Sequence, residues 1–141
     1  MTVILGINAY HGDSSACLLI NGKLIAAAEE ERFRRIKHWA GFPSDAIRYC
    51  LAEAGITTNQ IEHVAVSRNP KARLPQKALH VLARRPSISF LRDRLKNVSR
   101  IGSIENEFVH ALDVAPSKFN PRFHNVGHHL AHAASSFFVS P

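Results

Sequence analysis

Cysteine is scarce in this chain of 141 residues, which contains only Cys17 and Cys50. Each stands alone in an apolar run, so two unpaired, buried thiols are favoured over a disulfide, as in a reducing cytoplasm. Long hydrophobic runs are absent as well, since no stretch approaches the roughly 18–20 apolar residues that span a bilayer. The first residues, MTVILGINAYHGD, lack the basic region of a signal peptide. These absences predict a cytoplasmic protein with no membrane segment.

Acidic residues are nearly missing from one stretch of the chain. Between residues 68 and 100 a single acid, Asp93, faces ten lysines and arginines, which gives that stretch a charge of +9. The whole chain carries +7, so the remaining residues sum to −2. A basic segment can contact nucleic acid or another anionic surface, but nucleic-acid platforms interleave aromatic residues and this segment has only Phe90. We therefore favour a solvated basic helical insertion over residues 68–102, with helices at about 75–84 and 88–97, and expect no nucleic-acid partner.

The apolar content is sufficient for one folded unit. Apolar residues make up 45% of the chain and include eight phenylalanines, enough to bury a sizeable core. The opening of the chain predicts strands over Val3–Asn8, Ala16–Ile20 and Lys23–Ala28. The dipeptide Asn21-Gly22 is the strongest short hairpin signal, because both central residues of a type I′ turn need positive φ. The chain therefore opens with a three-stranded antiparallel meander.

Helices and strands alternate after the meander. A charged segment, Glu29–His38, fits either a solvated helix or the lining of a site. Ser44 is the expected N-cap of a helix that stops at Gly55. Further strands are expected over Ile61–Ser67 and Arg122–Val126, and further helices over Ile104–Leu112 and His128–Val139. The pattern predicts a mixed α/β fold whose later strands lie parallel and are joined by crossover helices.

Four of the nine histidines gather near the C-terminus, in the stretch HNVGHHLAHAASSFF from His124 to Phe138. His128 and His132 are i, i+4 neighbours on a helix, so both imidazoles can reach one ion of zinc, iron, nickel or copper. Two ligands do not complete a site, and no Asp or Glu follows Asp113 in the chain. The alternative is a helix that packs its small and aromatic residues into a core. The spacing alone leaves both interpretations open.

The loop after the first strand, AYHGDSS, gathers polar groups at a hairpin corner. Its backbone amides and the hydroxyls of Ser14 and Ser15 can form a cradle for an anion or a phosphate. His11 titrates near neutrality and can move a proton, while Asp13 can orient it or attract a cation. An ordinary polar turn accounts for the same residues. Neither GxxxxGK[ST] nor GxGxxG occurs, so no P-loop and no dinucleotide site is indicated.

Three stretches together resemble the N-terminal part of the NodU/CmcH-type carbamoyltransferases: HGDSSA at 11–16, EEERF at 29–33 and HHLAHA at 128–133. The resemblance covers almost the whole chain and is weakest in the basic segment. It implies the ribonuclease-H-like/actin-like fold of the sugar kinase, chaperone and actin ATPase superfamily. It also implies that the complete enzyme makes carbamoyl-adenylate from carbamoyl phosphate and ATP. The carbamoyl group then passes to a hydroxyl of a small acceptor, such as a sugar or an antibiotic-like molecule.

The same resemblance implies roles for individual residues. His11 matches the essential histidine beside the carbamoyl group. His128 and His132 match an HxxxH pair that ligates a divalent metal, with iron as the first choice and zinc or magnesium as the alternatives. The residues expected to contact the donor are Asp13, Ser14, Ser15, Arg32, Lys37 and His38.

Members of that family are several times longer than this chain. The resemblance therefore implies that residues 1–141 are an N-terminal fragment whose remaining region belongs to a longer protein or to a separate partner chain. The alternative is a non-catalytic remnant, or a subunit that uses its basic segment on anionic surfaces. A partial sheet with an uncovered edge or apolar face would favour self-association.

Overall fold

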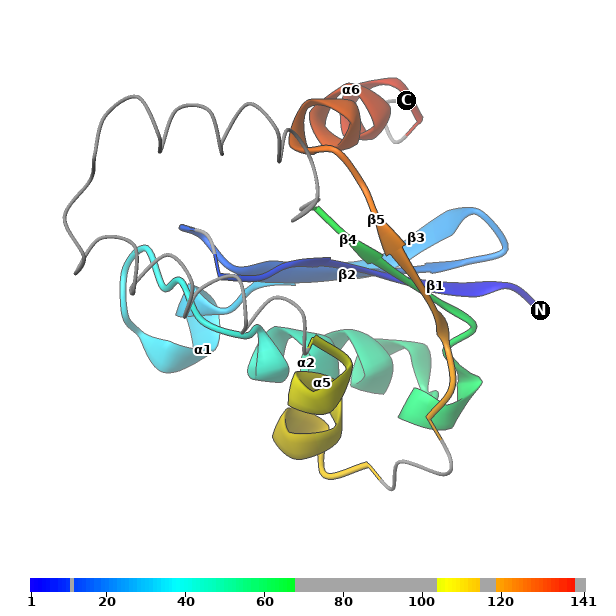
Figure 1. Cartoon of the computed structure of the whole chain (residues 1–141), viewed down its shortest axis with the longest axis horizontal. Helices are drawn as coiled ribbons and strands as arrows, with labels where there is room; N and C mark the ends of the chain where they lie inside the picture. Colours follow the sequence, from blue (N-terminus) through cyan, green and yellow to red (C-terminus); the bar gives the residue numbers. More distant parts are fainter. Residues whose placement is uncertain (11, 68–103, 115–118, 139–141) are drawn as a thin grey trace, which may run out of the picture.

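The computed structural model describes residues 1–10, 12–67, 104–114 and 119–138 (Figure 1). The expected basic insertion at 68–102, with its two helices, lies outside the described residues, and so does His11. The described strands form one five-stranded sheet in the order β3-β2-β1-β4-β5. They are β1 (Val3–Asn8), β2 (Ser15–Ile20), β3 (Lys23–Glu29), β4 (His63–Val66) and β5 (Arg122–Asn125).

The predicted meander is confirmed. β1 pairs antiparallel with β2, and β2 pairs antiparallel with β3. Both residues of the turn between β2 and β3 have positive φ, 51° at Asn21 and 81° at Gly22, as a type I′ turn requires. The later strands are parallel, β4 to β1 and β5 to β4, as the alternation of elements predicted. The fold is therefore mixed α/β, with a meander at one side of the sheet and parallel strands at the other.

One face of the sheet carries the core. The helices α2 (Ser44–Ala54) and α5 (Ile104–Leu112) lie on this face, together with the short α1 (Glu31–Arg34), whereas α6 (His128–Phe138) lies on the other face (Figure 1). Alternate residues of β1 point into this core and are buried, as the period of two in a strand requires. The ring of Phe108 on α5 contacts the rings of Phe42, Phe119 and Phe123. A 3₁₀ turn, η1 (Thr58–Gln60), precedes β4.

The start of α2 differs from the sequence prediction. Ser44 is the first helical residue rather than the N-cap, and the N-cap position is held by Pro43, which makes no side-chain cap. The carboxylate of Glu30, fully buried, accepts the helix-terminal N–H groups instead, from Asp45 at 3.0 Å and from Ala46 at 2.8 Å. The hydroxyl of Ser44 donates to the same carboxylate at 3.4 Å. A full negative charge at a helix N-terminus is a stronger acceptor than a hydroxyl, so Glu30 takes the capping role from 14 residues away.

The other end of α2 is as predicted. Gly55 has φ 62° and its amide donates to Ala52 and Leu51, which is the left-handed stop that glycine favours. The two cysteines are unpaired, as predicted, with Cys50 buried and Cys17 half-buried. Among the described residues, none of the helices is long and apolar enough to cross a membrane.

Candidate functional site

The carboxyl ends of the parallel strands meet at one edge of the sheet. β3 is antiparallel to β2 and therefore runs in the same direction as β1, β4 and β5. In open α/β sheets, ligands bind beyond this edge. A cavity of about 1010 Å³ lies between α6 and the face of the sheet that it faces, and it extends from the middle of the strands to this edge. Polar residues that line it are Asn8, Ser15, Glu29, Arg32, Ser67, His128, His132 and Ser135.

Two residues that the sequence did not single out hold the loop after β1. Asn8, the last residue of β1, donates from Nδ2 to the carbonyl oxygens of Gly12 at 3.4 Å and Asp13 at 3.1 Å. Ser67, directly after β4, donates from Oγ to Asn8 Oδ1 at 2.9 Å. The Ser67 hydroxyl therefore orients the side-chain amide of Asn8 so that its NH₂ group faces the loop. Their only sequence signal was their position, at or just after the end of a buried strand.

Asp13 and His38 come together at this edge although 25 residues separate them. His38 Nδ1 lies 2.8 Å from Asp13 Oδ1, and the His38 amide donates to Glu31 Oε2 at 3.1 Å. The hydrogen bond that His38 donates to the Asp13 carboxylate, and then the charge of that carboxylate, raise the pKa of His38 above its ordinary value of 6.5. Both residues have positive φ, 63° and 56°, a conformation that aspartate and histidine tolerate better than most residues. This pair leaves the second ring nitrogen of His38 available to a ligand.

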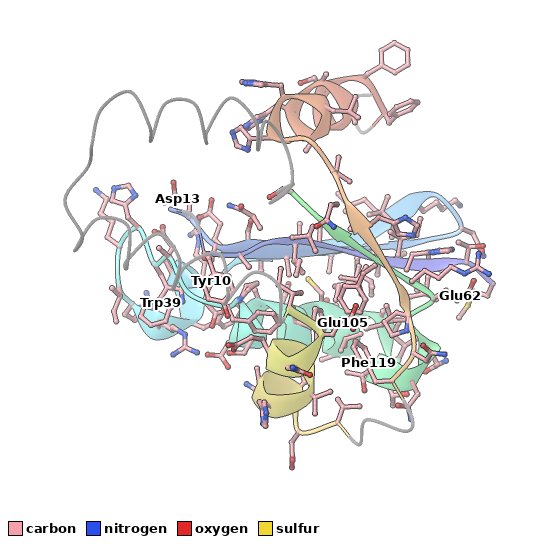
Figure 2. All side chains as sticks on the ribbon, in the orientation of Figure 1. Tyr10, Asp13, Trp39, Glu62, Glu105 and Phe119 are labelled. Carbon is pink, nitrogen blue, oxygen red and sulfur yellow. The ribbon has the colours of Figure 1, made fainter. Side chains whose placement is uncertain are left out.

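The neighbouring loop residues are fixed by the segment that follows α1. The Tyr10 amide donates to Gly41 at 3.2 Å and the Ser14 amide donates to Trp39 at 3.0 Å. In Figure 2 the labelled residues Tyr10, Asp13 and Trp39 lie at the same end of the sheet. The loop after β1 is therefore anchored on both sides, by Asn8 and by the residues after α1.

The two serines of the loop do not converge on one point, contrary to the expectation from the sequence. Ser14 is buried and its hydroxyl donates to the Gly41 carbonyl at 2.7 Å, away from the cavity. Ser15 begins β2 and lines the cavity. Successive residues of an extended chain point to opposite faces, which separates the pair. Of the basic residues predicted to contact the donor, Arg32 lines the cavity, whereas Lys37 and His38 are exposed and are not part of the lining.

His128 and His132 lie one turn apart at the start of α6, with their rings in contact. Their Nε2 atoms are 3.1 Å apart, and both side chains line the cavity. Two nitrogens at about 2.1 Å from one ion lie about 3.0–3.4 Å apart for ligand angles from square to tetrahedral. The pair therefore fits two positions of a metal site. In the part of the chain that the structure describes, no group of three His, Cys, Asp or Glu side chains converges to complete it.

The alternative interpretation of this helix, packing into a core, is not what the structure shows. No described residue of α6 is buried. The large apolar side chains that a core helix would bury are exposed, Leu130 at 66%, Phe137 at 78% and Phe138 at 79%.

The thiol of Cys17 also lines the cavity, next to Gly6. Burial raises the pKa of the Cys17 thiol above its ordinary value of 9.0. The thiol is therefore protonated at neutral pH and is not poised as a nucleophile. Chemistry at this cavity rests on its imidazole, guanidinium, carboxylate, amide and hydroxyl groups.

The comparison with protein families decides which kind of protein this is. The model of the family described as "Carbamoyltransferase N-terminus" matches residues 3–141. The chain belongs to this carbamoyltransferase family. The predicted resemblance is thus confirmed at the level of the family, while the roles of single residues stay predictions.

Two curated relatives are much longer than this chain. "Uncharacterized protein sll1178" of Synechocystis is 37% identical over 152 aligned positions, which cover 100% of this chain and 24% of the relative. "Nodulation protein NolNO" of Sinorhizobium fredii is 35% identical over 133 positions, which cover 94% of this chain and 18% of the relative. The chain therefore spans about a quarter or less of the length of these proteins. Among solved structures, YeaZ from Pseudomonas aeruginosa matches with 16% identity and a TM-score of 0.49, over 97% of this chain and 50% of that one.

Proposed function

We propose that this chain forms the N-terminal part of a cytoplasmic O-carbamoyltransferase and binds the donor, carbamoyl-adenylate, at the carboxyl edge of its sheet. The family match over residues 3–141 carries the proposal. The cavity supports it, because a cavity of about 1010 Å³ has room for a nucleotide-sized donor and is lined by Arg32 and the His128–His132 pair. The complete enzyme would form this donor from carbamoyl phosphate and ATP.

The transfer step needs a base and a site for negative charge. A base removes the proton of the acceptor hydroxyl, the oxygen attacks the carbamoyl carbon, and the bond from that carbon to the phosphate oxygen breaks as AMP leaves. His11 is the proposed base, because HGDSSA at 11–16 matches the motif that holds the family's essential histidine and an imidazole can take up this proton. The charge on the phosphate would be met by Arg32, and by His38 in the protonated form that Asp13 favours.

A divalent metal fits the proposal as a third contribution. The ligands would be His128 Nε2 and His132 Nε2, and the ion would supply Lewis-acid stabilisation of phosphate oxygens. The chain's own contribution is to hold the two imidazoles 3.1 Å apart on one helical turn, on the cavity side.

Donor binding by this chain tests the proposal directly. Carbamoyl phosphate carries the carbamoyl group of the donor and ATP carries its adenylate group. Isothermal titration with each of them, with and without Zn²⁺, should therefore show binding to the wild-type chain. Arg32→Ala should weaken it by about tenfold, because one charge-assisted contact is lost. Lys23→Ala, an equally basic and exposed position at the start of β3 away from the cavity, should leave the affinity unchanged.

The catalytic role is tested in the longest natural form of the protein. His11→Asn should abolish transfer while donor binding stays measurable. Normal turnover in that variant would exclude His11 as the base.

A second candidate is a non-catalytic subunit that needs a partner chain. It is favoured by the exposed apolar side chains on α6. No binding of either substrate with or without Zn²⁺, together with self-association in light scattering, would favour this candidate over the enzyme.

A further inference from the structure

A second pair of histidines lies on the sheet itself. His63 is the first residue of β4 and His124 is the third residue of β5. His63 Nδ1 is 3.1 Å from His124 Nε2, and the ring centroids are 5.1 Å apart. The two residues are 61 positions apart in sequence, so only the pairing of β4 with β5 brings them together.

Strand alternation places both rings on the same face. Val64 and Val66 are buried against the helices, so His63 points to the opposite face. Phe123 packs on Phe108 in the core, so His124 also points away from it. In the register of the two strands His63 lies opposite Arg122, and His124 is two residues further along β5. Diagonal neighbours of this kind are within reach of long side chains.

The backbone around the pair is held by hydrogen bonds on both sides of β4. The Glu62 amide donates to Val3 at 3.1 Å, the Arg122 amide to Glu62 at 2.9 Å, and the Val126 amide to Val66 at 2.8 Å. The two imidazoles are therefore presented from a paired sheet and not from mobile loops. Such preorganisation lowers the cost of bringing two ligands to one ion.

The pair is distinct from the site at the carboxyl edge. Neither His63 nor His124 lines the cavity. Glu62, the neighbour of His63, lies at the opposite end of the molecule from Asp13 in Figure 2. A ligand at this pair therefore does not depend on the proposed transferase function.

We propose that His63 Nδ1 and His124 Nε2 bind one borderline divalent metal ion, of the class of zinc, copper or nickel. The separation of 3.1 Å lies within the roughly 3.0–3.4 Å expected for two nitrogens on one such ion. The two nitrogens are hydrogen-bonded in the structure, so the proton that one of them carries moves to the other nitrogen of its ring when the ion binds. Neutral imidazoles suit these ions, and both ring nitrogens serve as ligands in proteins. Water completes the coordination, since no third His, Cys, Asp or Glu of the described residues joins the pair. The ion would link the edge strand β5 to β4.

Zinc titration of a variant without the other pair tests this site. The background is His128→Gln with His132→Gln, and the readout is the long-range ¹H–¹⁵N spectrum of the histidine rings during addition of ZnCl₂. The ¹⁵N signals of His63 Nδ1 and His124 Nε2 should shift as Zn²⁺ is added. The shifts should saturate when one Zn²⁺ is bound per chain in this background. The melting temperature should rise with added Zn²⁺, because the ion binds only the folded pair.

Single substitutions then separate a built site from general histidine binding. His63→Gln and His124→Gln should each weaken Zn²⁺ binding in that background at least tenfold and remove the rise in melting temperature. His110→Gln, an exposed histidine on α5, is the matched control and should change neither. Equal affinity in all three variants would overturn the proposal, and so would coordination of His63 through Nε2, because the geometry requires Nδ1.

Discussion

Glu30 should be the single most important polar side chain for the stability of this fold. It is fully buried and sits between α1 and α2. Its carboxylate accepts hydrogen bonds from the amides of Asp45 and Ala46, and from Arg34 Nε at 2.7 Å. Glu30→Ala would leave two amides at the start of α2 and one guanidinium without this partner.

Glu30→Ala is expected to lower the free energy of unfolding by about 3 kcal/mol. Loss of a helix cap costs about 1 kcal/mol and at most about 2. A buried donor left without an acceptor adds about 1–3 kcal/mol. The ion pair with Arg34 adds little beyond this, because the Arg34 side chain is 34% exposed and can be solvated. The variant no longer has to bury a charged carboxylate, which offsets part of the loss. The net loss of stability is therefore near the lower end of the sum of these contributions.

Urea unfolding followed by far-UV circular dichroism measures this cost. Glu30→Gln should lose about 2 kcal/mol, because one acceptor oxygen becomes an NH₂ group that faces other donors. The control is Glu53→Gln, on an exposed position of the same helix, which should stay within about 0.5 kcal/mol of the wild type. Amide hydrogen exchange at Asp45 and Ala46 should become faster in Glu30→Ala. A loss below about 1 kcal/mol, or unchanged exchange at these two amides, would refute the capping role.

Two further outcomes follow from particular contacts. Gly6→Ala should destabilise the fold by about 1–3 kcal/mol, since a Cβ there would lie 2.7 Å from Cys17 Sγ. Adding Cys17→Ala should restore most of the lost stability in urea unfolding. A double variant as unstable as Gly6→Ala would show that this contact is not the cause. The pKa of His38, measured by NMR titration, should exceed 6.5 and should fall in Asp13→Asn. Because the folded pKa is raised, the stabilisation from this pair is full below the unfolded pKa and is lost as the pH rises through the folded value. The difference in stability between wild type and Asp13→Asn should therefore be larger at acidic than at alkaline pH, and a difference independent of pH would contradict the pairing.

The sequence predicted the local elements well, because these elements depend on backbone conformations and spacings that particular residues set. Asn21-Gly22 fixes a turn because the backbone there needs two positive φ angles, and Gly55 ends α2 for the same reason. The spacing of His128 and His132 sets their contact through helix geometry alone. The failure at Ser44 is instructive, because the local pattern allowed a serine cap while a distant carboxylate took its place.

Residue roles were harder to predict than elements. The resemblance pointed to Asp13, His38 and Arg32, and the structure places Asp13 against His38 and Arg32 at the cavity. It did not point to Asn8 or Ser67, which position the loop after β1. Ser14 was expected beside Ser15, but strand alternation turned its hydroxyl towards Gly41.

The sequence by itself determined the meander, the stop of α2 at Gly55 and the family, because these depend on φ preferences, side-chain periods and short motifs. Only the tertiary structure decided which distant residues meet: Asn8 with Ser67, Asp13 with His38, Glu30 with the start of α2, and His63 with His124. These contacts depend on strand order and register, and a period of two along each strand does not specify which strand lies beside it. The pairing of β4 with β5 sets one pair of histidines on the sheet, and the position of α6 sets the other pair at the cavity.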